Sequence, residues 1–313
     1  MASPSVLILD PLHTETQAAL EKRFPCIRLF DAGDKPALLS SLADSVQVVA
    51  THSAYGISNH ELDALPRLKL VCNFGVGIDT INVPDCTARG VRVCNTPDVL
   101  TEDVADMALA LLLASVRQIV RGDHYVRAGR WLNQNMAFTA TLQERKVGIV
   151  GLGRIGRAIA RRCEAFNTAI AYTGPNQKSD VAYEYHADIV TLAHWADVLI
   201  AACPGGPATA GLVSAEALTA LGPSGVFVNI ARGSVVDQAA LITLLQSGQL
   251  GTAGLDVFAD EPVVPAELMA MDHVVLQPHQ GSATVPTRMA MGQLVIDNIA
   301  AWFDNKPLLT AVN

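Results

Sequence analysis

The stretch KVGIVGLGRIGRAIA, residues 146–160, decides the fold of this chain. The β-branched run at 147–150 predicts a buried strand, GLGRIG predicts a tight turn, and the Ala- and Arg-rich residues after it predict a helix. In such a unit Gly151 permits the turn, Gly153 lets a pyrophosphate approach the backbone, and Gly156 lets the helix pack on the strand. The free N–H groups of the helix start favour an anion. The stretch therefore predicts dinucleotide binding rather than an ordinary turn.

The composition sets the class of protein. The chain has 313 residues, half of them hydrophobic, which suits two domains built on parallel sheets covered on both faces. No apolar run reaches the roughly 18 residues of a membrane span, and the start MASPSVLILDP lacks a basic secretory region. We therefore expect a cytoplasmic protein without a membrane partner. A net charge of −8 argues against nucleic acid as a partner.

The six cysteines are scattered, with no CxxC and no paired His/Cys spacing. The pattern predicts small buried thiols, and it predicts neither a structural metal nor a disulfide framework.

The first part of the chain repeats a strand-helix pattern, with strands expected at 6–9, 27–30, 46–50, 68–73 and 91–94. Two loops that follow strands, 51–56 and 74–79, are candidate binding loops because ligands bind at the carboxyl ends of parallel strands. The second loop carries two glycines, whose backbone N–H groups could cradle a small carboxylate. The same glycines could equally serve only the turn.

A long helix is expected to follow, with Thr101 as its N-cap, Arg117 and Arg121 near its negative end, and Gly122 closing it. Its middle, 107–116, is apolar nearly all round, which predicts burial on several sides. Residues 123–144 have no clean period and are interpreted as an excursion.

The next strand, 169–173, ends about 20 residues beyond the glycines, where an NAD-binding unit has an acidic residue for the ribose hydroxyls. The sequence there is Thr173-Gly174-Pro175-Asn176-Gln177-Lys178-Ser179, with no acid. Its absence removes a repulsion of a 2′-phosphate, and the polar residues from Asn176 onward could donate to one. We therefore expect NADP(H) to be favoured, with NAD(H) possible because no arginine stands in this loop.

Four further strands are expected at 198–202, 225–230, 254–257 and 274–277, and each runs into a polar loop. Parallel pairing would place these loops on the edge that carries the glycine turn. Arg232, Glu261 and His279 follow three of the strands. An arginine fork grips a carboxylate, and a histidine oriented by a carboxylate supplies a proton. Together they could bind a 2-oxo acid and supply the proton that its carbonyl oxygen needs when hydride arrives. Taken singly, Arg232 could be part of a surface ion pair, Glu261 a solvated turn residue and His279 a core histidine.

Four motifs, in this order, resemble those of the D-isomer-specific 2-hydroxyacid dehydrogenases. They are residues 151–156, residues 229–237, residues 254–258 together with Glu261-Pro262, and Pro278-His279 together with residues 281–284. The glyoxylate/hydroxypyruvate reductase branch is the most similar. The resemblance implies an α/β protein with two doubly wound parallel-sheet domains. A Rossmann-type cofactor domain would span 99–286, and a flavodoxin-like substrate domain would span 1–98 and 287–313. It also implies a homodimer that turns a small 2-oxo acid into a D-2-hydroxy acid.

The resemblance also implies residue roles. Arg232 would hold the substrate, His279 would be the acid/base, and Glu261 would pair with His279. The expected cofactor contacts are Gly151, Gly153, Arg154, Ile155, Gly156, Thr173, Gly174, Asn176, Cys203, Ile230, Ala231, Asp256, Gly281 and Ser282. The expected substrate contacts besides Arg232 are Ser53, Val76 and Gly77.

Two alternatives stay open. A phosphite-type dehydrogenase of the same superfamily would use the same residues, whereas the formate enzymes have a glutamine in place of Glu261. A nucleotide-sensing protein similar to the corepressors of this fold would keep the three residues with negligible turnover.

Overall fold

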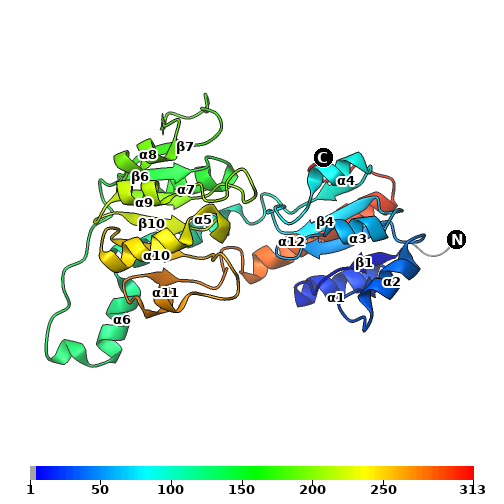
Figure 1. Ribbon diagram of the computed structural model, residues 1–313, viewed down its shortest axis with the longest axis horizontal. Coiled ribbons are helices and arrows are strands. Elements are labelled where there is room, and N and C mark those ends of the chain that lie inside the picture. Colours follow the sequence, from blue (N-terminus) through cyan, green and yellow to red (C-terminus); the bar gives the residue numbers. More distant parts are fainter. Residues whose placement is uncertain (1–4) are drawn as a thin grey trace. The chain divides into compact units, whose positions relative to one another are not determined.

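The computed structural model describes residues 5–313, which divide into two compact units. Unit 1 contains the chain up to Leu100 together with Ala283–Asn313, and unit 2 is Thr101–Ser282. Each unit is a parallel sheet with helices against it (Figure 1), which confirms the expected α/β class.

Unit 1 has a five-stranded parallel sheet in the order β2-β1-β3-β4-β5, the flavodoxin order. The strands are β1 Val6–Ile8, β2 Cys26–Arg28, β3 Val48–His52, β4 Leu70–Phe74 and β5 Arg92–Cys94. The helices are α1 Thr14–Arg23, α2 Lys35–Leu42, α3 Asn59–Ala64, α4 Val83–Ala88 and α12 Val285–Phe303. The C-terminal helix α12 packs on α1 and β4, which returns the end of the chain to the first unit.

Unit 2 has a seven-stranded parallel sheet in the order β12-β11-β10-β9-β6-β7-β8. The strands are β6 Lys146–Val150, β7 Ala169–Thr173, β8 Glu184–Tyr185, β9 Val198–Ala201, β10 Val226–Asn229, β11 Thr252–Leu255 and β12 Val275–Leu276. The helices are α5 Thr101–Val116, α6 Ile119–Arg127, α7 Arg154–Glu164, α8 Ile189–Trp195, α9 Ala215–Leu221, α10 Gln238–Ser247 and α11 Ala266–Ala270. Two short 3₁₀ turns lie at Arg130–Leu132 and Gly233–Val235.

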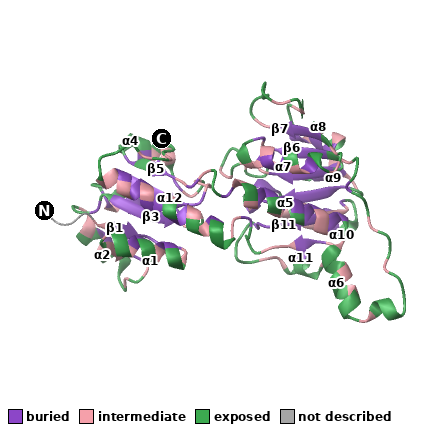
Figure 2. Cartoon of the chain, turned by 180° about the vertical axis from the view of Figure 1, so that it is seen from behind, coloured by how far each residue is buried: buried purple, intermediate pink, exposed green. Residues whose placement is uncertain are grey.

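The strand order of unit 2 reverses between β6 and β9, because the chain builds outward from β6 in one direction and later in the other. The central strands of unit 2 are buried over most of their length, the edge strand β8 is not, and the outer faces of the helices are exposed (Figure 2), as expected for a sheet covered on both sides. The switch point therefore places the ends of β6 and β9 where doubly wound proteins bind dinucleotides.

The long helix does not end as the sequence predicts. Helix α5 stops at Val116, and Gln118 adopts a left-handed conformation with φ +47°, which an α-helix cannot continue. A new helix, α6, starts at Ile119 and contains Gly122 in its interior, so the expected closure at Gly122 is wrong. Arg117 and Arg121 accordingly lie outside the last turn of α5.

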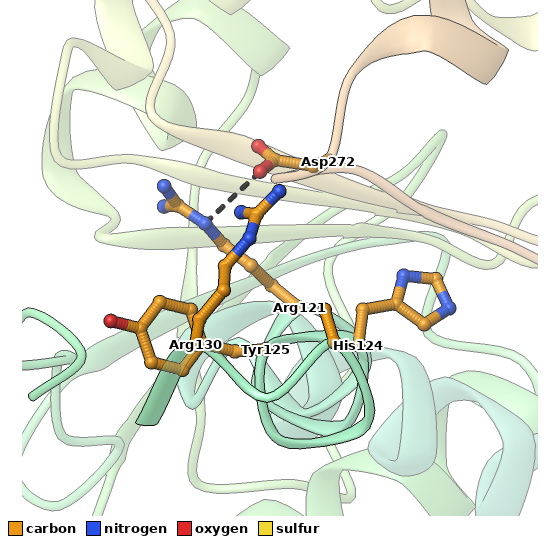
Figure 3. Close-up of a pocket in the computed structure, with 6 residues that line it drawn as sticks. Arg121, His124, Tyr125, Arg130 and Asp272 are labelled. Atoms are coloured by element: carbon orange, nitrogen blue, oxygen red, sulfur yellow. Dashed lines mark ion pairs between the residues drawn. The ribbon is translucent and has the colours of Figure 1, made fainter. Parts of the chain in front are cut away.

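Residues 117–141, which we call the arm, leave the body of unit 2 (Figures 1 and 2). Arg121 Nε lies 3.1 Å from Asp272 Oδ2, and the Tyr125 hydroxyl donates to the carbonyl of Gln134 at 2.8 Å. A cavity of about 190 Å³ lies beside this ion pair, and Figure 3 shows its side chains. It is lined by Arg121, His124, Tyr125, Ala128, Arg130 and Asp272, none of them an expected site residue.

Among residues 5–313, no helix combines the length and the apolar character that crossing a membrane requires.

Candidate active site

The glycine turn has the geometry that an approaching phosphate requires. Gly151 has φ +95°, and a Cβ there would lie 2.8 Å from Cys203 Cα, so the ends of β6 and β9 touch at this point. A Cβ on Gly156 would overlap the Gly151 carbonyl, whereas a Cβ on Gly153 would meet nothing within 4 Å. Helix α7 begins after Gly153 without a side-chain cap. Open space thus lies over uncapped N–H groups, which fits a pyrophosphate.

The end of β7 adjoins this turn, because the Gly151 N–H donates to the Thr173 carbonyl at 2.9 Å. Thr173 is buried, Gly174 is partly buried, and Asn176 is exposed. Residues 173–179 carry no carboxylate, and the next acidic residue is Asp180.

His279 and Glu261 form a hydrogen-bonded pair, with Nδ1 and Oε2 2.7 Å apart. The other carboxylate oxygen, Oε1, accepts the Phe258 N–H at 3.0 Å, which fixes the orientation of the carboxylate. The pair leaves Nε2 as the outward nitrogen of an imidazole that is 44% exposed. His279 can therefore exchange a proton through Nε2 while Glu261 holds the ring.

The environment keeps Glu261 ionised. Burial by itself raises the pKa of this carboxyl, but the hydrogen bond with His279 and the charges of His279 and Arg232 outweigh it, so the net shift is downward. An ionised Glu261 holds the imidazole through Nδ1. Arg232 thus lies close enough to act on Glu261 through its charge, and its Nη1 donates to the Ala231 carbonyl at 2.8 Å.

Asp256 anchors the loop that carries His279. It is 1% exposed, and its two oxygens accept the N–H groups of Gln280 at 2.6 Å and Gly281 at 2.8 Å. The His279 N–H donates to the Asp256 carbonyl at 2.9 Å. Burial raises the pKa of Asp256, although the two N–H donors oppose that shift. His279 itself has φ +54°, a strained conformation that these bonds support.

The other expected cofactor residues of unit 2 have mixed exposure. Ile230 and Ala231, directly after β10, are buried, as is Gly281, while Cys203, Ile155 and Ser282 are partly exposed and Arg154 is exposed. The fold thus brings the turn after β6, the end of β7 and the loops after β9–β12 to the carboxyl edge of one parallel sheet.

In unit 1 two of the expected substrate residues, Val76 and Gly77, belong to one turn, residues 75–77, and the third, Ser53, contacts that turn from the end of β3. Ser53 Oγ donates to the Gly77 carbonyl at 2.7 Å, and Asn95 Nδ2 donates to the Val76 carbonyl at 2.9 Å. Asn73 Nδ2 donates to Ser53 Oγ at 3.0 Å and to the carbonyls of Gly75 and Gly77 at 3.1 and 2.9 Å. The carbonyls of the turn are all held by side chains.

The N–H groups of Val76 and Gly77 make no hydrogen bond within residues 5–313. With the carbonyls turned toward side chains, these donors have the arrangement that could bind a small anion, and we call residues 75–77 the anion-binding turn. Ser53, Val76 and Gly77 were predicted from the sequence, whereas Asn73 and Asn95 were not. The available signal was a polar residue at the end of an apolar strand: Asn73 is the fourth residue of β4, and Asn95 directly follows β5.

The comparisons with known proteins agree with this geometry. Residues 109–281 match the model of the D-isomer-specific 2-hydroxyacid dehydrogenase NAD binding domain. The chain is 45% identical over 312 residues to glyoxylate/hydroxypyruvate reductase A of Arabidopsis thaliana, and 44% identical over 312 residues to hydroxyphenylpyruvate reductase of Plectranthus scutellarioides; each match covers 100% of both chains.

A solved structure of NADPH-dependent glyoxylate/hydroxypyruvate reductase from Sinorhizobium meliloti, in complex with NADP and malonate, superposes with a TM-score of 0.92. It is 42% identical, and the match covers 99% of this chain and 97% of that one.

A glycine turn at the switch point of a doubly wound sheet, with an arginine and a His–Glu pair on the same edge, defines an NAD(P)-dependent oxidoreductase. The chain belongs to the D-isomer-specific 2-hydroxyacid dehydrogenase family.

Replacing Asn73 by alanine should raise the KM for a 2-oxo acid by about tenfold, because the turn loses two hydrogen bonds to its carbonyls and Ser53, which also holds the turn, loses a third. Steady-state kinetics should show little change in kcat or in the KM for the dinucleotide. Asn82→Ala, which removes the N-cap of α4 in the same unit, is the matched control and should leave every KM unchanged. A fall in kcat with unaltered KM in N73A would contradict this role.

Glu261→Gln should lower the reduction rate about 10- to 100-fold and should make it decline at a lower pH than in the wild type. The reason is that the pKa of Glu261 lies below its ordinary value, so the wild-type carboxylate stays charged through the neutral range, whereas the amide is neutral. Rates measured from pH 5 to 9 check this. An unchanged pH profile would show that Glu261 does not support the proton donor.

Proposed function

We propose that this protein reduces a small 2-oxo acid, glyoxylate or hydroxypyruvate, with NADPH and releases the corresponding 2-hydroxy acid, which has the D configuration where the product is chiral. The observation that carries the proposal is the 2.7 Å hydrogen bond between His279 and Glu261, on the sheet edge that also carries the glycine turn.

The chain's own residues divide the chemistry between them. When bound, the reduced nicotinamide supplies the hydride that adds to the carbonyl carbon. Arg232 holds the carboxylate and the carbonyl oxygen of the substrate through its planar fork, which draws electron density from the carbon. His279 delivers the proton from Nε2 to the carbonyl oxygen, and Glu261 stabilises the imidazolium before the transfer. One hydride and one proton convert the carbonyl group into the alcohol.

The anion-binding turn in unit 1 suits the carboxylate of a 2-oxo acid. The N–H groups of Val76 and Gly77 donate to it, while Ser53, Asn73 and Asn95 hold the backbone in that arrangement. The turn is made of backbone donors, which recognise a carboxylate without regard to the rest of the substrate.

The preference for NADPH rests on the loop after β7. The absence of a carboxylate at 173–179 removes a repulsion of the 2′-phosphate, and the similar Sinorhizobium meliloti enzyme is NADPH-dependent. The choice of glyoxylate or hydroxypyruvate rests on the names of that enzyme and of the Arabidopsis thaliana relative. The Plectranthus scutellarioides relative makes an aromatic 2-oxo acid the strongest competing substrate.

Initial rates with NADPH and NADH against glyoxylate, hydroxypyruvate, pyruvate and 4-hydroxyphenylpyruvate test the proposal. We expect the highest kcat/KM with NADPH and one of the first two acids. Higher kcat/KM for the aromatic acid would overturn the substrate assignment alone. No oxidation of either dinucleotide with any acid would overturn the reductase, and turnover of phosphite with NADP⁺ would replace it with the phosphite-type reaction.

The arm is the surface that a second copy of the chain would cover. Six large apolar side chains on it are exposed, which is an unusual concentration for a monomer: Ile119, Val120, Val126, Trp131, Leu132 and Phe138. The ion pair of Arg121 with Asp272 ties the start of the arm to unit 2 (Figure 3). We propose a homodimer built on the arm and, as a separate proposal, a cytoplasmic location for the enzyme.

The double variant Trp131→Asp and Leu132→Asp should convert the dimer into a monomer, because charges on the arm oppose burial of its apolar surface. Light scattering should give about twice 33.1 kDa for the wild type and 33.1 kDa for the variant. Val285→Asp, at an exposed valine of unit 1, is the control and should remain dimeric. A dimeric double variant would exclude the arm as the interface.

A further inference from the structure

Helix α7 supplies an arginine to the loop after β7. Arg157 Nη2 lies 2.9 Å from Asp180 Oδ1, although the two residues are 23 positions apart. Arg157 is on the first turn of α7, directly after the glycine turn, where its N–H donates to the Gly153 carbonyl. The sequence analysis found no arginine in the loop itself, because the side chain arrives from a different element.

The surroundings of this ion pair are cationic and partly open. The Arg157 side chain is 31% exposed and that of Asp180 is 66% exposed, so solvent reaches both. The charges of Arg157 and Lys178 both act on Asp180, and the pKa of Asp180 is lowered mainly by its hydrogen bond with Arg157. Two cations therefore flank a single exposed carboxylate. The rings of Tyr172 and Tyr183 also lie within electrostatic reach of Arg157.

Two tyrosines fix the course of the loop that carries Lys178. The Lys178 N–H donates to the Tyr172 hydroxyl at 2.6 Å, and the Tyr185 hydroxyl donates to the Gly174 carbonyl at 3.0 Å. The two rings pack against each other with centroids 5.3 Å apart, and Tyr172 is 1% exposed. The backbone of Lys178 is thus held at a fixed place beyond the end of β7.

The position of the pair corresponds to one end of a dinucleotide. In doubly wound sheets the ribose nearest the second strand lies between the glycine turn and the end of that strand, and its 2′ substituent faces the following loop. Here the glycine turn and the end of β7 are joined by the Gly151–Thr173 hydrogen bond. Arg157 lies on helix α7, which follows the glycine turn, and Lys178 lies in the loop that follows β7.

We propose that Arg157 and Lys178 bind the 2′-phosphate of NADP(H), and that Asp180 is the counter-ion which this phosphate displaces from Arg157. A phosphate monoester carries more negative charge than the carboxylate, so it is the stronger partner for the guanidinium. The exposed Arg157–Asp180 pair holds its partner only weakly. The inference rests on the proposed preference for NADPH and names the residues that would cause it.

Asp180 gives the proposal its sharpest consequence. If the Asp180 carboxylate competes with the 2′-phosphate for Arg157, the Asp180→Asn variant should bind a ligand with a 2′-phosphate more tightly than the wild type does. If Asp180 instead accepted hydrogen bonds from the ribose hydroxyls, the Asp180→Asn variant would bind ligands without a 2′-phosphate less tightly than the wild type does.

The experiment is calorimetric titration of the full chain, free of dinucleotide, with 2′,5′-ADP and with 5′-AMP, which differ only in the 2′-phosphate. We expect the wild type to bind 2′,5′-ADP about tenfold or more tightly than 5′-AMP. Arg157→Gln should reduce that ratio about tenfold while leaving 5′-AMP unchanged, and Asp180→Asn should raise the affinity for 2′,5′-ADP about threefold. In the reductase assay the KM for NADPH should rise in Arg157→Gln and fall in Asp180→Asn, and kcat should stay unchanged in both.

Arg161→Gln is the matched control, because Arg161 lies one turn further along α7 and pairs with Glu102 at 3.2 Å. It should leave both affinities unchanged, and Arg157→Lys should retain part of the ratio if the glutamine variant fails to fold. Equal ratios in R157Q and R161Q would overturn the inference, as would weaker 5′-AMP binding in D180N. A wild type that binds the two ligands equally would instead overturn the proposed preference for NADPH.

Discussion

The proposed chemistry depends on the hydrogen bond between the Glu261 carboxylate and His279. One oxygen is fixed by the Phe258 N–H, so the other can only meet His279 Nδ1, at 2.7 Å. This arrangement selects the ring nitrogen that faces outward and places a negative charge beside an imidazole that must carry a proton. Without the backbone donor the carboxylate would rotate, and without the carboxylate the imidazole would lose both its orientation and its charge partner.

Buried polar side chains position the functional groups in both units. Asp256 holds the loop of His279 through two backbone N–H groups, and Asn73 holds the turn at 75–77 through two carbonyls. In each case the buried side chain makes hydrogen bonds to the backbone of a loop, and the groups proposed to meet the ligand are left out of those bonds. Such groups are costly to bury without partners, so they also fix a single loop conformation. The sheets deliver the loops to one edge, and these side chains set their final geometry.

The sequence was sufficient for features that follow from local pattern. The strand-turn-helix unit at Gly151, the two sheets, and the placement of Arg232, Glu261 and His279 on one edge depend on hydrophobic periodicity and parallel topology. The break at Gln118 could not be foreseen, because the apolar period continues past it and a left-handed residue there depends on tertiary context. The reach of Arg157 to Asp180 and of Asn73 to Gly77 depends on side-chain conformations that spacing does not encode.

A single-turnover measurement tests the central claim, that His279 is the proton donor for hydride transfer. The complex of protein and NADPH is mixed rapidly with hydroxypyruvate, and cofactor oxidation is followed for the wild type and for His279→Asn. The account predicts that the variant binds NADPH within about twofold of the wild type while the transfer rate falls by about 100-fold or more. An unchanged transfer rate, or an equal loss of NADPH binding and of transfer, would contradict it.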